Sequence, residues 1–359
     1  MFGRKWWHPN KTNVSKAFRY RGNVSFDREL NDLKNCQIFV PNKELLNDPC
    51  EMLTDDISFI QLLEYIERKK GISIEKIKSE FEIFKDRILK AGIFSLSVSK
   101  EPLNLLLWSH YANSHKGFCI EYDLDVLTQY NNEVNTFWVN YSDKIPVFKP
   151  KLFLGKDNEV IRHFTGFKSK YWKYENEFRL LYDNSGLQDY EHKAVRSIYF
   201  GIRMDDKEKE RIFETLQGRS IQYFQMCLLP RKYELYSEKI VDPYYRVKRE
   251  IVINNHEDVT WFLENAKSDY GIELSDYLRK AINLVSNYPN VQSIKEAIVI
   301  FNKDTPIMKV EYQKFGLEFK PPKIYRFTKE DIDNEYENTV EIERKKEKIN
   351  EQRPSLVSQ

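Results

Sequence analysis

The sequence of 359 residues lacks the short signatures that assign a chemistry directly. It contains no GxGxxG, GxxxxGK[ST] or HExxH pattern, so the usual signals of Rossmann, P-loop and zincin chemistry are missing. Its four cysteines form no CxxC pair, which disfavours a zinc site or a disulfide framework and fits a reducing compartment. We expect no metal cofactor.

Long apolar runs and a strong excess of one charge are also missing. No apolar run reaches the ~18 residues needed to span a bilayer. The amino-terminal stretch MFGRKWWHPNK has no apolar centre of the kind found in signal peptides. With 57 basic and 55 acidic residues the formal net charge is +2, so contact with nucleic acid or a membrane would need a local patch. We therefore expect a cytoplasmic protein without a membrane partner.

Aromatic residues, by contrast, are abundant. The chain has 23 Phe, 22 Tyr and 6 Trp, which supply large buried surfaces although only 41% of the residues are hydrophobic. Short strand patterns are interrupted by helix patterns without a regular βαβ repeat, which predicts an α+β fold with a mixed or antiparallel sheet and flanking helices. Composition divides the chain into an irregular arm (1–16), an α+β core with a candidate active-site cleft (17–240), a mostly helical extension (241–328) and a charged tail, either a solvated helix or disordered (329–359).

Reactive side chains are densest between Gly166 and Leu181, in the stretch GFKSKYWKYENEFRLL. Read as a strand with a period of two, this stretch places Glu175, Glu177 and Arg179 on one face and mostly apolar residues on the other. Such a face is either a solvated ladder of charges or a site held over a cleft. The motifs elsewhere in the chain favour the site.

Two earlier strand patterns carry residues suited to an anion or a sugar. In AFRYRG, Arg19 and Arg21 share one strand face, and guanidinium groups bind phosphate or carboxylate bidentately. In GIFSLSVSK, Ser95 and Ser97 share a face with Ser99 and offer hydroxyls to a sugar or phosphate. The alternatives are an edge strand with surface arginines and a half-exposed strand with small polar residues.

A helix is predicted from Pro102 to about Lys116. Three leucines, His110 and Tyr111 recur along it at helical spacing, which predicts that His110 lies toward the apolar stripe. A histidine there is either a core residue with a satisfied hydrogen bond or part of a site. We include His110 and Tyr111 among the residues expected to bind a cofactor.

The motifs follow one another in the order of a known family. The YR pair near the start, NDP, FSLS, WSHYA with HKGF, KYWKYENEFRL and SIYFG all occur between about residues 17 and 230. In these motifs the chain resembles the bacterial family catalogued as domain of unknown function 2971. That name asserts no activity, but members lie in bacterial and phage-related genomes, often near defence genes. The resemblance implies a role in bacterial antiviral defence or as a toxin-like effector.

A second resemblance is to ADP-ribosyltransferases of the arginine–serine–glutamate class. These enzymes carry an arginine on an early strand, a Ser-x-Ser strand and a later Glu-x-Glu strand. This chain has the same order in Arg21 or Arg19, Ser95-Leu96-Ser97 and Glu175-Asn176-Glu177.

This second resemblance implies NAD as the substrate. The early arginine would bind the pyrophosphate, and the serine pair would hold the nicotinamide-side ribose. Glu177 would stabilise the oxocarbenium-like transition state as nicotinamide leaves. Glu175 would face the acceptor and help to deprotonate it. No turn motif for target recognition precedes Glu175, so the acceptor, protein or nucleic acid, stays open.

Two other functions are compatible with the same residues. One is a non-catalytic sensor or binding module for a phosphorylated ligand or nucleotide, in which the carboxylates pair with Arg179 or Arg21. The other is a metal-dependent nuclease, although no ligand spacing supports it and the NDP stretch is mainly turn chemistry. Its residues would be Asp48, Glu51, His110 and Glu177.

The extension beyond residue 240 lies outside both resemblances. Residues 258–286 are predicted to be helical with one glycine interruption, residues 293–301 to continue that pattern, and residues 306–325 to be more extended. The extension could recognise a defence-system partner, regulate the core or cap it, and the sequence does not choose among these.

Overall fold

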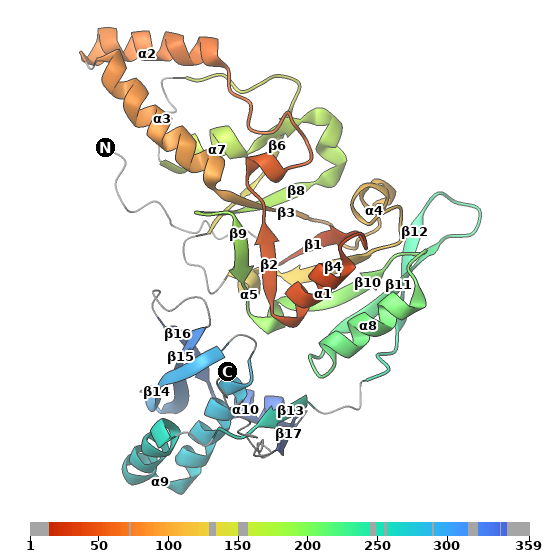
Figure 1. Cartoon of the computed structure of the whole chain (residues 1–359), viewed down its shortest axis with the longest axis vertical. Helices are drawn as coiled ribbons and strands as arrows, with labels where there is room; N and C mark the ends of the chain where they lie inside the picture. The colour runs from red at the N-terminus through yellow and green to blue at the C-terminus, as the bar shows by residue number, and fades with distance from the viewer. Residues whose placement is uncertain are drawn as a thin grey trace, which may run out of the picture. The chain divides into compact units, whose positions relative to one another are not determined.

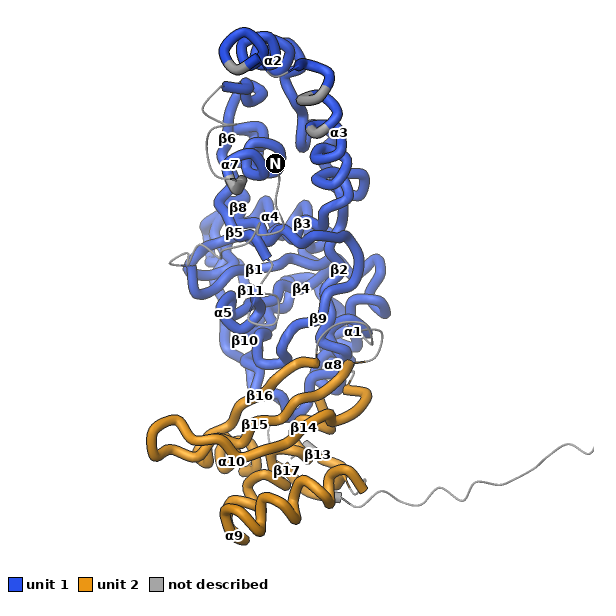
Figure 2. Tube along the Cα trace, turned by 90° about the vertical axis from the view of Figure 1, so that its left-hand side faces the viewer, with its two compact units in different colours: residues 1–245 blue, residues 246–359 orange. Residues whose placement is uncertain are grey.

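The computed structural model describes residues 14–71, 73–128, 134–149, 157–244, 249–254, 257–288, 291–314, 322–337 and 339–342. The chain divides into two units, Met1–Tyr245 and Arg246–Gln359, coloured blue and orange in Figure 2. Most of the arm predicted over residues 1–16, and the tail beyond residue 342, fall outside the described residues. Helices and strands occur together in both units, which confirms the α+β class. Within the described parts of the chain, no helix is both long and apolar enough to cross a bilayer.

A sheet of eight strands organises the first unit (Figure 1). Among its described strands only β10 and β11 pair in parallel, and all other neighbours are antiparallel, so the sheet is mixed as predicted. The strands lie in the order β12 (Leu235–Ile240), β11 (Gln222–Leu228), β10 (Val195–Phe200), β4 (Phe118–Asp123), β1 (Lys16–Arg21), β3 (Gly92–Ser97), β8 (Glu177–Tyr182) and β5 (Asn135–Trp138).

Helices cover both faces of this sheet. On one face, α1 (Phe26–Lys34) and α8 (Asp206–Leu216) lie side by side, in front of β4, β10 and β11 in Figure 1. Each helix presents an apolar stripe to the core, made of Phe26, Leu30 and Leu33 in α1 and of Ile212, Phe213 and Leu216 in α8. On the opposite face, α4 (Leu105–Tyr111) packs Leu107 and Trp108 against Phe18, Tyr20, Cys119 and Tyr199.

A helical hairpin is formed by α2 (Asp56–Lys70) and α3 (Ile74–Lys90). Gly71 ends α2 with φ 63°, a left-handed conformation that favours glycine. Aromatic side chains of α3 pack against α7 (Asp157–Thr165) in a second cluster. Two small sheets complete the unit: β2 (Gln37–Val40) with β9 (Gly186–Asp189), and β6 (Asn140–Ser142) with β7 (Phe167–Ser169).

His163 on α7 lies inside this aromatic cluster. Its ring centroid is 4.4 Å from that of Phe148, and its Nε2 is buried without a hydrogen-bond partner among the described residues. Burial lowers the pKa of His163 from 6.5 to about 4. Near pH 5 the ring is therefore neutral in the folded protein, whereas the unfolded chain carries it charged.

We expect His163 to lower the free energy of unfolding by about 1 to 2 kcal/mol between about pH 7 and pH 5. The sign follows because the unfolded chain binds a proton that the folded protein excludes, so stability falls as the pH drops from 6.5 toward about 4. Urea unfolding at both pH values measures the slope, and His163→Leu should remove this part of it. His110→Leu is the control, because His110 is exposed in the folded protein as it is in the unfolded chain. Equal slopes in wild type and His163→Leu would contradict the expectation.

The second unit packs one long helical segment against an antiparallel sheet of three strands in the order β14, β15, β16. The segment is two helices that meet at Gly271, whose φ of 86° and ψ of 176° are not helical. A further pair, β13 with β17, is parallel. The elements are β13 (Arg249–Val252), α9 (Glu257–Ser286), β14 (Val291–Asn302), β15 (Thr305–Lys314), β16 (Lys323–Phe327), α10 (Lys329–Tyr336) and β17 (Thr339–Ile342).

One prediction for this unit is wrong: residues 293–301 belong to β14, not to a helix. Four apolar residues there do recur at helical spacing, but Ile and Val dominate the segment and favour a strand. Ala297 and Val299, two positions apart, are both buried, and β14 pairs with β15 over its whole length. The helix predicted over residues 258–286, with its glycine interruption, is confirmed.

Candidate functional site

Three neighbouring strands of the large sheet, β1, β3 and β8, carry the candidate arginines, the serines and Glu177. Strands β3 and β8 pair along their whole length, with Ser97 opposite Glu177 and Ser95 opposite Arg179. Strands β1 and β3, by contrast, share a single register pair, Phe18 with Ser97. The sheet therefore opens between β1 and β3 on one side of that pair.

A pocket of about 230 Å³ lies at this opening. Residues of β1, β3, the NDP turn and α4 contribute much of its wall, together with the start of β8. A concave site with a few convergent polar groups among apolar ones suits a small ligand. The polar and charged residues on the wall are Arg19, Asn47, Glu51, Ser95, Ser97, Tyr111, Lys168, Glu175 and Glu177.

The two glutamates do not share one strand, so that prediction is wrong. Glu175 ends a 3₁₀ helix, η2 (Lys170–Glu175), and β8 begins only at Glu177. Between them Asn176 has a left-handed backbone with φ 45°, a conformation that asparagine adopts more readily than most residues. This turn breaks the alternation of a strand, yet both carboxylates still reach the pocket.

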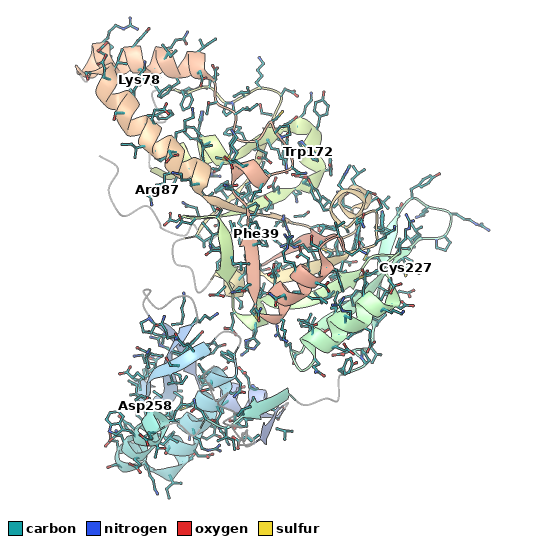
Figure 3. The ribbon with its side chains drawn as sticks, viewed as in Figure 1. Phe39, Lys78, Arg87, Trp172, Cys227 and Asp258 are labelled. Atoms are coloured by element: carbon teal, nitrogen blue, oxygen red, sulfur yellow. The ribbon has the colours of Figure 1, made fainter. Side chains whose placement is uncertain are left out.

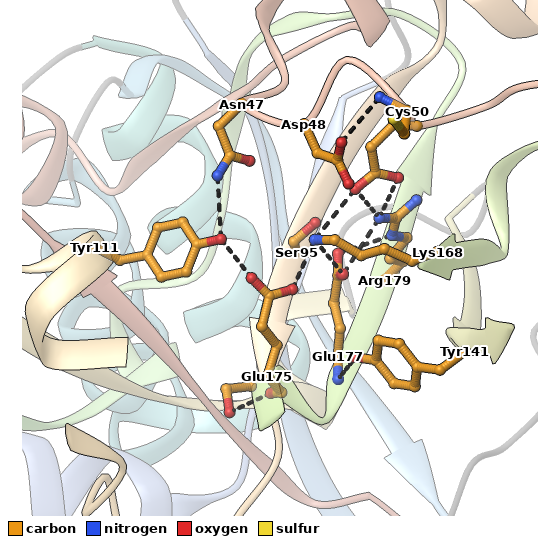
Figure 4. Close-up of polar contacts among 12 residues, drawn as sticks. Asn47, Asp48, Cys50, Ser95, Tyr111, Tyr141, Lys168, Glu175, Glu177 and Arg179 are labelled. Carbon is orange, nitrogen blue, oxygen red and sulfur yellow. Dashed lines mark hydrogen bonds and ion pairs between the residues drawn. The ribbon is translucent and has the colours of Figure 1, made fainter. Parts of the chain in front are cut away.

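Five charged side chains, Glu51, Lys168, Glu175, Glu177 and Arg179, form a buried ion cluster (Figure 4). Lys168 Nζ lies 2.6 Å from Glu175 Oε2, 3.2 Å from Glu177 Oε2 and 3.2 Å from Glu51 Oε1. Arg179 Nη2 donates to both carboxylate oxygens of Glu51, at 2.8 and 2.7 Å, and Arg179 Nε donates to Glu177 at 2.8 Å. Each member is at most 7% exposed, so the charges are compensated by one another rather than by water.

The ion cluster gives the two pocket glutamates different electrostatics. Burial alone would raise the pKa of Glu177, but Arg179 and Lys168 outweigh burial and hold this pKa at about 2. Burial raises the pKa of Glu175, and the opposing effect of Lys168 does not cancel it, in part because Glu177 lies nearby. Glu177 is therefore a fixed negative charge at neutral pH, whereas Glu175 is the carboxyl better suited to exchange a proton.

Two tyrosine hydroxyls form hydrogen bonds with the pocket glutamates, and Tyr111 also lines the pocket. Tyr111 donates a short hydrogen bond to Glu175 Oε1 and accepts one of 3.1 Å from Asn47 Nδ2. The Tyr141 hydroxyl accepts from the backbone N–H of Glu177 at 2.9 Å. Burial raises the pKa of both tyrosines, so they stay protonated at neutral pH.

The two serines contact the glutamates in different ways. Ser97 Oγ donates to the backbone carbonyl of Glu175 at 2.7 Å and so holds the end of η2 against β3. The Ser95 side chain forms a hydrogen bond with the Glu177 carboxylate, which helps to lower the pKa of that group. The Ser95 carbonyl accepts from Arg19 Nη1 at 2.6 Å.

The structure separates the two candidate arginines. Arg21 Nε lies 3.1 Å from Glu29 Oε2 on α1, and Arg21 is not on the pocket wall. Arg19, like Arg21, leaves β1 on the side of the sheet that α1 covers, and its guanidinium lies over the ring of Phe94. It nevertheless reaches the pocket through the opening between β1 and β3, beside Ser95. Its Nε is buried without a hydrogen-bond partner in the described parts of the chain. Burial lowers the pKa of Arg19 to about 10, so the guanidinium is charged at neutral pH and available to an anion.

His110 does not lie on an apolar stripe, contrary to the prediction. Asn104 caps α4, its side chain accepting from the backbone N–H groups of the second and third helical residues, so the helix begins later than Pro102. The buried face is centred on Trp108, and His110 is exposed. The His110 ring lies beside Trp172 and is not among the residues that line the pocket.

Lys168 is the residue of this site that the sequence did not single out. It lies on β7, seven residues before Glu175 and nine before Glu177, in the same stretch of reactive side chains. Its third carboxylate partner, Glu51, lies far earlier in the chain, so the local pattern alone does not predict the cluster. Within the described residues no group of three or more His, Cys, Asp or Glu side chains is placed to hold a metal ion. Of the residues considered for a nuclease, Glu51 and Glu177 contact Arg179, and Asp48 accepts from the backbone N–H of Cys50 at 2.9 Å.

Residues 107–180 match a family model described as "Protein of unknown function (DUF2971)". This supports the family resemblance over α4 to β8, a shorter span than residues 17–230, and includes Tyr111, Lys168, Glu175 and Glu177. No curated protein and no solved structure matches the chain.

Proposed function

We propose that this protein is an NAD-consuming ADP-ribosyltransferase in which Arg19, rather than Arg21, binds the pyrophosphate. The observation that supports it is the meeting of three motifs at one pocket: Arg19 from β1, the serine pair from β3 and Glu177 from the start of β8. The resemblance in sequence required only that the motifs follow one another along the chain. That the three motifs also lie on neighbouring strands around one opening does not follow from their order along the chain, and so is independent support for the proposal.

The chemistry assigned to Glu177 follows from its fixed charge. As the bond between ribose C1′ and nicotinamide breaks, the electron pair leaves with nicotinamide and positive charge develops on the ribose. A preorganised carboxylate stabilises that charge more in the transition state than in bound NAD. The hydrogen bonds from Arg179 and Ser95 keep Glu177 ionised and oriented, although they also weaken its field.

Incubation of the protein with NAD labelled in the ADP-ribose part tests the proposal. Release of nicotinamide together with transfer of the label would support a transferase, and release with free ADP-ribose would support NAD hydrolysis at the same site. Retention of NAD without turnover would favour a binding module for a phosphorylated ligand. The observation in favour of that second candidate is that Glu177 pairs with both Arg179 and Lys168. A buried ion-pair network with a purely structural role has the same arrangement as a catalytic carboxylate held by cations.

Arg19→Lys should raise KM for NAD by about 10-fold, because an ammonium cannot replace the bidentate guanidinium fork. Arg21→Lys is the matched control: it is on the same strand, keeps its charge beside Glu29 and lies off the pocket wall. Its KM should stay within about two-fold of wild type. Steady-state kinetics per folded molecule measures both. A larger effect at Arg21 than at Arg19 would contradict the assignment.

For the biological setting we propose bacterial antiviral defence, which rests on the family resemblance alone. Deletion of the gene under native expression should raise sensitivity to phage, and a catalytically impaired Glu177→Gln chain should not restore protection. Unchanged phage sensitivity after deletion would count against this setting but leave the proposed chemistry untouched.

A further inference from the structure

A surface of aromatic rings and lysines adjoins the pocket. Residues 170–175 of η2, KYWKYE, end at Glu175, which lines the pocket. Tyr171 is 80% exposed, and Lys170 and Lys173 are exposed beside it. We term residues 170–174 together with His110 the ring surface; its Trp172 is labelled in Figure 3.

Three rings of this surface, those of His110, Trp172 and Tyr174, come from two segments and form a group. The His110 and Tyr174 centroids are 6.1 Å apart, and those of Trp172 and Tyr174 are 6.0 Å apart. His110 is exposed and Trp172 and Tyr174 are half-buried, so each of the three residues remains at least partly accessible to solvent. Lys170 Nζ lies 5.8 Å from the centroid of the Tyr171 ring, and its ion pair with Asp143 is exposed, hence weak and exchangeable.

Aromatic rings interleaved with lysines are typical of protein surfaces that bind single-stranded nucleic acids. Bases stack on exposed rings regardless of sequence, and lysines contact the phosphates. A protein partner is disfavoured by the lysines, which are depleted from protein–protein interfaces. The formal net charge of +2 gives no general attraction for polyanions, so a local patch of this kind is what such binding would require.

We infer that the acceptor of the ADP-ribosyl group is a single-stranded nucleic acid, whose bases stack on the ring surface and whose phosphates contact Lys170 and Lys173. This inference rests on the proposed function. Because η2 ends at Glu175, a nucleotide on the ring surface lies next to the carboxyl that faces the pocket. A base nitrogen or sugar hydroxyl bonds to C1′ as nicotinamide leaves with the electron pair of the broken bond, and the proton of the acceptor passes to the Glu175 carboxylate.

The binding arm of the test needs no NAD. Fluorescence anisotropy of short labelled RNA and DNA strands with the full-length chain gives their affinity. Tyr171→Ala should weaken binding by about 10-fold, the scale of one lost base stack, whereas Tyr171→Phe keeps the ring and should keep the affinity. Tyr233→Ala is the matched control, since Tyr233 is 97% exposed in the same unit but lies in the β11–β12 turn; its affinity should stay that of wild type.

The transfer arm offers labelled NAD with single-stranded RNA, single-stranded DNA, duplex DNA or casein. Label on either single strand supports the inference and identifies the strand; label on duplex DNA or casein alone overturns it. Equal oligonucleotide affinity in wild type and Tyr171→Ala also overturns it. Nicotinamide release without any oligonucleotide binding refutes this inference and leaves the proposed function standing. Oligonucleotide binding that needs Tyr171, without nicotinamide release, refutes the proposed transferase and with it the transfer step, and leaves only a nucleic-acid-binding surface.

Discussion

Glu177→Gln should lower NAD turnover per folded molecule by about 100-fold or more, the scale found when one preorganised electrostatic group is removed from an active site. Glutamine keeps the size and much of the hydrogen bonding of glutamate but carries no charge for the developing cation on the ribose. Affinity for NAD should change far less than turnover, because the charge develops only in the transition state. Single-turnover kinetics with nicotinamide detection separates the two quantities.

The structure makes a stability control necessary for this variant. Glu177 compensates Arg179 and Lys168 in the buried ion cluster, so Glu177→Gln should lower the melting temperature as well as the rate. Glu51→Gln removes a carboxylate that contacts the same two cations, and we expect a comparable loss of stability with less than about 10-fold loss of turnover per folded molecule. If both variants lose turnover only in proportion to folded protein, the transferase proposal fails.

Arg179→Met should lower the free energy of unfolding by about 3 to 5 kcal/mol, because it leaves buried carboxylates without their cation. Arg179 is 0% exposed and donates to Glu51, Glu177 and the Thr165 carbonyl, so three segments lose a common partner. Urea unfolding measures the change.

Arg211→Met is the control for charge removal as such. The Arg211 side chain is 51% exposed and pairs with Asp27, which is 86% exposed, so its loss should cost less than about 1 kcal/mol. A similar change at Arg179 and Arg211 would show that the ion cluster is far less important for folding than its burial indicates.

Periodicity in the sequence predicted the elements that bury a regular stripe or face. Strand β3 lies within the predicted stretch GIFSLSVSK, and helix α9 matches the helix predicted over residues 258–286 with its glycine interruption. Their local pattern and their tertiary environment agree, which is the condition under which a single sequence is informative. In β14 the local pattern and the tertiary environment disagree: the apolar residues recur at helical spacing, but pairing with β15 makes the segment a strand.

The site was predictable in its residue types but not in its connections. The alternation of residues in this stretch does not reveal that Asn176 has a left-handed backbone. The prediction therefore placed Glu175 on the strand, whereas β8 begins only at Glu177. Lys168 and Arg179 meet Glu51 only because segments distant in the chain come together. The choice between Arg19 and Arg21 depends on where two strands stop pairing, which no local pattern encodes.

The single register pair between β1 and β3 also has a mechanical consequence. On the α1 side of the sheet one core joins strands from both sides of this seam, including Ala17 and Ile120 with Phe94 and Phe178. On the pocket side the backbone ladder is absent beyond Phe18 and Ser97. The shared core thus acts as a hinge, about which the two parts of the sheet can rotate slightly toward or away from each other without breaking a strand ladder. We therefore expect the width of the pocket to adjust to its occupant at little cost in backbone hydrogen bonds.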